Sequence, residues 1–121
     1  MKTLAYRKQN ASLQKFVTDK EVLSDTLERI VSAMFQRYSK NTDETKYYQI
    51  VWNELSYMVS FDGESDKLSV TIVKCSAYLE PTHLVTFKPY DYINFETAIT
   101  TADMYFIMLV YEMYAKNVYQ A

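Results

Sequence analysis

The sequence predicts a single α+β domain with a three-stranded antiparallel sheet and two main helices, in the chain order helix, strand, strand, strand, helix. Apolar residues recur with helical spacing over residues 23–38 and again over the last quarter of the chain. Between these segments, apolar residues alternate with polar ones on both sides of an Asp-Gly pair. The 121 residues, of which 49% are apolar and 23% charged, suffice for one domain with a packed core.

The start of the chain differs in charge from the rest of the domain, which spans residues 1–121. Residues 1–40 contain eight basic and four acidic side chains, whereas residues 41–121 contain five and eleven, so the net charges are +4 and −6. A loosely ordered basic arm is one interpretation of residues 1–17. Its basic residues are spread out and not clustered, which is not typical of a surface that grips phosphates. We therefore expect no direct binding of nucleic acid.

The first helix is expected to begin near Thr18, because Thr18 and Glu21 have the spacing of a capping box. The residues that follow place apolar side chains on one side of a helical wheel and charged ones on the other, as in a surface helix with one buried face. The apolar side consists of Leu23, Leu27, Ile30, Val31, Met34 and Tyr38.

The segment after this helix can be interpreted in two ways. Tyr48, Ile50 and Trp52 alternate in one register, and the apolar residues from Leu55 to Phe61 alternate in the other. One strand with a bulge near Asn53 would explain both registers, and its aromatic and β-branched content favours a strand. Residues 47–55 also fit helical spacing, so a helix ending near Leu55 is the alternative.

The next two strands have clear boundaries. Asp62-Gly63 and the acidic residues after it separate two alternating segments, which predicts a β-hairpin. In the returning strand, Leu68, Val70 and Ile72 share one face. The third strand, residues 82–88, follows Pro81 and ends before Pro89, a residue that cannot donate a ladder hydrogen bond.

The last helix is expected to start at Asn94 as N-cap, with Glu96 in its first turn. One apolar stripe forms the expected core face: Phe95, Ile99, Ala102, Phe106, Leu109, Val110 and Met113. A second apolar stripe lies opposite: Met104, Ile107, Met108, Tyr111, Ala115 and Val118. Leaving the second stripe in water would create an apolar patch of a size that is unusual for a monomer.

Three explanations of the second stripe remain open from the sequence: the first helix covers it, a second copy covers it in a homodimer, or a different protein binds it. The loop before the helix is a further candidate contact, since Tyr90 and Tyr92 flank Asp91 on a connection that should reach the surface. Residues 104–111 are the longest uncharged apolar stretch, and eight residues cannot span a membrane.

Few residues could support catalysis or hold a metal ion. Cys75 and His83 are the only thiol and imidazole, and a hairpin that turns at residues 80–81 would pair Cys75 with Thr86 and place the thiol and imidazole on opposite faces. A register shifted by one residue would place them on the same face, at least one diagonal apart. A Cys/His zinc site is therefore excluded. The acids of residues 62–66 lack the bidentate acid of a calcium loop, and a single glycine cannot build a phosphate-binding loop. The sequence predicts neither an enzyme nor a metal or cofactor site.

These observations favour a protein-binding module whose partner is another protein, or a second copy of itself in a homodimer. The single cysteine and the lack of a secretory signal suggest the cytoplasm. Small size and an acidic, aromatic body would suit an inhibitor or adaptor of the kind that phages and mobile elements encode, including one that blocks a host nucleic-acid-binding protein. This suggestion is an analogy at the level of class. The alternatives are a structural homo-oligomer, such as a small phage assembly protein, and a small enzyme of unknown reaction.

Overall fold

The computed structural model describes residues 11–17, 19–37, 46–52, 54–63, 68–77, 79–89, 93–95 and 99–119. The elements in chain order are β1 (Ala11–Val17), α2 (Lys20–Arg37), β2 (Lys46–Trp52), β3 (Leu55–Asp62), β4 (Ser69–Cys75), β5 (Thr82–Phe87), β6 (Asn94–Phe95) and α3 (Thr101–Tyr119). The predicted α+β class and the two main helices are confirmed. The predicted number of strands is wrong, because the sheet formed by the described residues has six strands in the order β1-β2-β3-β4-β5-β6.

Four long antiparallel strands, β2 to β5, form the body of the sheet, and β6 adds a short antiparallel edge. β1 pairs with β2 in parallel. Parallel neighbours cannot be joined by a tight turn, and here α2 lies between them in the chain. Residues 11–17, for which the sequence suggested a loose arm, therefore form an edge strand.

The segment with two alternating registers is a hairpin and neither a bulged strand nor a helix. Trp52 pairs with Leu55, so only two residues connect β2 to β3. Glu54, the second of them, has a φ of 67°, in the left-handed region that tight hairpin turns use. A two-residue turn and a bulge both change the register of alternation, which is why the sequence pattern did not distinguish them. Asn53 lies outside the described residues.

The Asp62-Gly63 hairpin and both later strands are confirmed. β3 and β4 pair from Asp62 opposite Ser69, and Gly63 has a φ of 107°, which a residue with a Cβ reaches only with strain. Leu68, Val70 and Ile72 are fully buried, as the alternation predicted. The residues of the turn and the alternation of the strand beside it were therefore sufficient to predict this hairpin.

α2 also begins close to the predicted residue. The backbone amide of Glu21 donates to Asp19 Oδ1 at 2.7 Å, and that of Val22 donates to the same atom at 3.3 Å, so Asp19 caps the helix. Thr18, the predicted cap, lies outside the described residues, as does Tyr38. The predicted apolar stripe from Leu23 to Met34 is buried in the main core.

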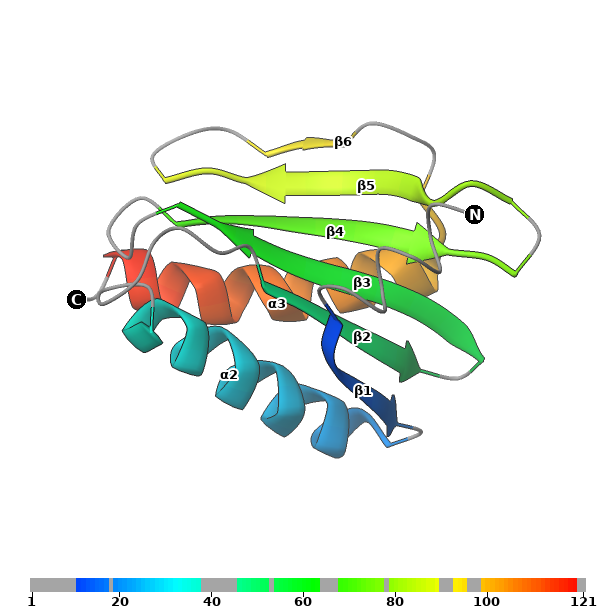
Figure 1. The fold of residues 1–121 in the computed structure, drawn as a ribbon, viewed down its shortest axis with the longest axis horizontal. Helices are drawn as coiled ribbons and strands as arrows, with labels where there is room; N and C mark the ends of the chain where they lie inside the picture. Colours follow the sequence, from blue (N-terminus) through cyan, green and yellow to red (C-terminus); the bar gives the residue numbers. More distant parts are fainter. Residues whose placement is uncertain are drawn as a thin grey trace.

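Both helices lie on one side of the sheet and contact each other (Figure 1). The main core fills the space between this helix layer and the inward face of β2 to β5. The opposite sheet face carries a smaller apolar cluster of Tyr47, Met58 and Cys75, with Val73 against it. None of the helices among the described residues has the length and apolar composition needed to cross a membrane.

Candidate functional site

The second apolar stripe of the last helix lies on α3, and its members differ in exposure. Ile107 has no exposed surface and belongs to the main core. The prediction that Ile107 contacts a partner is therefore wrong. Met108, the next residue, is 42% exposed. Four further members of the stripe are half-buried: Met104, Tyr111, Ala115 and Val118. The predicted contact residues Tyr90, Asp91 and Tyr92 lie outside the described residues.

The orientation of α3 explains these differences. Its side toward α2 is marked by Tyr105, whose ring centroid lies 4.8 Å from Lys20 Nζ, and by Lys116, which lies 3.9 Å from Glu28 Oε2. Tyr111 instead faces β5, with its ring centroid 5.2 Å from that of Phe87. We call the half-buried and exposed members of the second stripe the outer flank of α3: Met104, Met108, Tyr111, Ala115 and Val118. α2 does not cover this flank.

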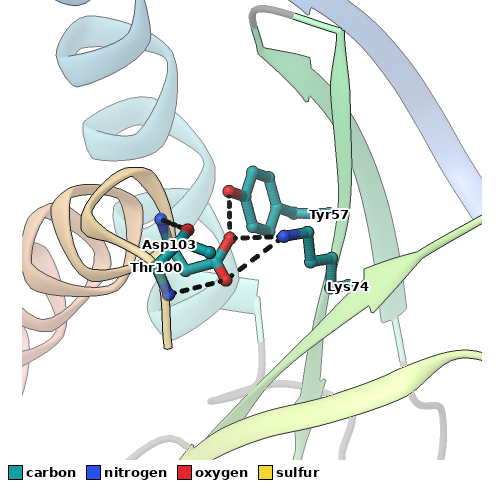
Figure 2. Close-up of polar contacts among 4 residues, drawn as sticks. All are labelled: Tyr57, Lys74, Thr100 and Asp103. Atoms are coloured by element: carbon teal, nitrogen blue, oxygen red, sulfur yellow. Dashed lines mark hydrogen bonds and ion pairs between the residues drawn. The ribbon is translucent and has the colours of Figure 1, made fainter. Parts of the chain in front are cut away.

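A buried polar cluster joins the first turn of α3 to the sheet (Figure 2). Asp103 is only 2% exposed, and its carboxylate faces two strands. Tyr57 Oη of β3 donates to Asp103 Oδ1 at 2.7 Å, and Lys74 Nζ of β4 lies 3.1 Å from Oδ1 and 3.3 Å from Oδ2. The cluster therefore ties the helix start to the middle of the sheet.

Asp103 also caps α3 together with Thr100. The amide of Asp103 donates to Thr100 Oγ1 at 3.1 Å, and the amide of Thr100 donates to Asp103 Oδ2 at 3.3 Å, as in a capping box. The predicted start at Asn94 is wrong, because Asn94 lies in β6 and pairs with Thr86. The Thr-x-x-Asp spacing was visible in the sequence, but the apolar pattern extended back past it to Phe95.

The electrostatics of the cluster keep it in one protonation state. Burial tends to raise the pKa of Asp103, but hydrogen bonds from Tyr57, Lys74 and the Thr100 amide, together with the charge of Lys74, outweigh burial and lower that pKa below its usual value. Burial and the bond to Asp103 raise the pKa of Tyr57 far above its usual range. These contacts favour the protonated phenol and the charged carboxylate, and the cluster anchors the first turn of α3 to β3 and β4.

An aromatic contact supports the same anchor. The ring of Tyr57 stacks on Phe106, one turn after Asp103, with centroids 4.1 Å apart and an interplanar angle of 11°. The hydroxyl of Tyr57 thus binds the first turn of α3 while its ring packs against the second. The sequence did not indicate this pairing, because Tyr57 and Asp103 are 46 residues apart.

The cysteine and histidine do not form the predicted arrangement. His83 pairs with Val73 and Thr86 with Thr71, because an irregularity between Ile72 and Val73 shifts the register of β4 and β5. His83 therefore points to the same face as Cys75, not the opposite one. Its Nε2 lies 2.8 Å from Thr86 Oγ1, so the imidazole is engaged in a bond along its own strand.

No group of three His, Cys, Asp or Glu side chains that could hold a metal ion occurs in the described part of the chain. No family model, curated protein or solved structure matches this sequence.

Proposed function

We propose that this chain is a non-enzymatic protein-binding module that presents the outer flank of α3 to another protein. The observation that carries the proposal is the contrast between neighbours on one helix: Ile107 is buried and Met108 is 42% exposed within a continuous apolar stripe. Apolar side chains that line up on a partly exposed helix surface are typical of helix-mediated contacts. Methionine suits such a surface, because its flexible thioether adapts to the shape of a partner.

The buried cluster at Asp103 also supports this proposal. It uses polar groups that a catalytic site could have used, and it saturates them within the fold. The anchor at its first turn and its buried residues hold α3 in place, so exposed Met108 contributes little to the position of the helix. An intracellular inhibitor or adaptor, of the kind that phages and mobile elements encode, would need a rigid surface of this type.

Site-specific crosslinking tests the proposal. A photo-crosslinking residue, p-benzoylphenylalanine, replaces Met108 in one variant and Val22 in another, and both are illuminated in the cell that makes the protein. Val22 is a matched control, because it is also apolar, lies on α2 and is 49% exposed. We expect a defined adduct from position 108 and none from position 22. No adduct at 108, or equal adducts at both positions, would contradict the proposal.

A homo-oligomer is the second candidate, since an exposed apolar stripe can also bind a second copy. An adduct of twice the chain mass at position 108 would identify this case.

A further inference from the structure

We draw no further inference here: the strongest candidate, the side-chain cluster of His83, Thr86 and Thr71 that the irregularity between β4 and β5 brings together on the sheet face opposite the helices, carries nothing, because its hydrogen bonds join its own members and nothing in the described part of the chain shows what substrate or ligand it would bind.

Discussion

The first turn of α3 and the outer flank of the same helix differ in what their side chains contact. At the first turn, the carboxylate of Asp103 binds Tyr57, Lys74 and the Thr100 amide. Along the outer flank, apolar side chains are only partly covered, and Met108 is 42% exposed. The polar contacts and the buried residues of α3 together hold the helix on the sheet, so Met108 contributes little to the stability of the fold. On our proposal, one helix is thus both a core element and a contact surface.

The largest loss of stability is expected from a change at Ile107, which tests the boundary between the outer flank and the core. Ile107→Asp places a charge without a partner in the main core, which costs on the order of 5 kcal/mol or more and approaches the whole stability of a small domain. We expect circular dichroism to report an unfolded chain. A folded Ile107→Asp variant would show that Ile107 lies on the surface and that the orientation of α3 described above is wrong.

The next effect concerns the anchor. Asp103→Ala leaves Tyr57 Oη and Lys74 Nζ without their acceptor and removes half of the capping box, so the free energy of unfolding should fall by about 3 kcal/mol in urea denaturation. Tyr57→Phe keeps the stacked ring and removes only one bond. It should therefore cost about 1 kcal/mol. Equal effects of the two changes would contradict the central place of the carboxylate in the cluster.

The pH dependence of stability follows from the same carboxylate. Because the pKa of Asp103 is lower in the folded than in the unfolded state, its contribution is complete above its unfolded value of about 4 and is lost as the pH falls through the folded value. The unfolding free energy of the wild type should thus fall as the pH drops below about 4. Asp103→Asn should be less stable near neutral pH and show a shallower fall in acid. An identical acid profile would show that other carboxyl groups control it.

The smallest effect on stability is expected at Met108. Met108→Asp replaces a partly exposed side chain, so the urea midpoint should move by less than about 0.5 kcal/mol of unfolding free energy. Val22→Asp, at a similar exposure on α2, should behave alike. A large loss of stability in Met108→Asp alone would place this residue within the core and remove the distinction between the two regions of α3.

The sequence predicted best those features that local chemistry controls. Buried Leu68, Val70 and Ile72 followed from simple alternation, and the turn at Gly63 followed from the need for a positive φ. The stripe of α2 followed from helical spacing. The turn at Glu54 was missed, because a non-glycine residue occupies the left-handed region there and gives no sequence signal.

Features that depend on distant contacts could not be predicted in this way. β1 is a strand because of its parallel pairing with β2, beyond an intervening helix, and residues 11–17 have little strand pattern of their own. The bond between Tyr57 and Asp103 joins positions that only the folded sheet brings together. The outer flank was predicted as an apolar stripe, but only the orientation of α3 separates Ile107 from Met108.

The most direct test of the account measures the affinity for the partner captured at position 108, with Met108→Asp and Val22→Asp compared side by side. Both variants should unfold at nearly the same urea concentration as the wild type. We predict that Met108→Asp weakens the complex by at least about tenfold and that Val22→Asp leaves it unchanged. Equal affinities of the two variants would contradict the claim that the outer flank of α3 is the contact surface.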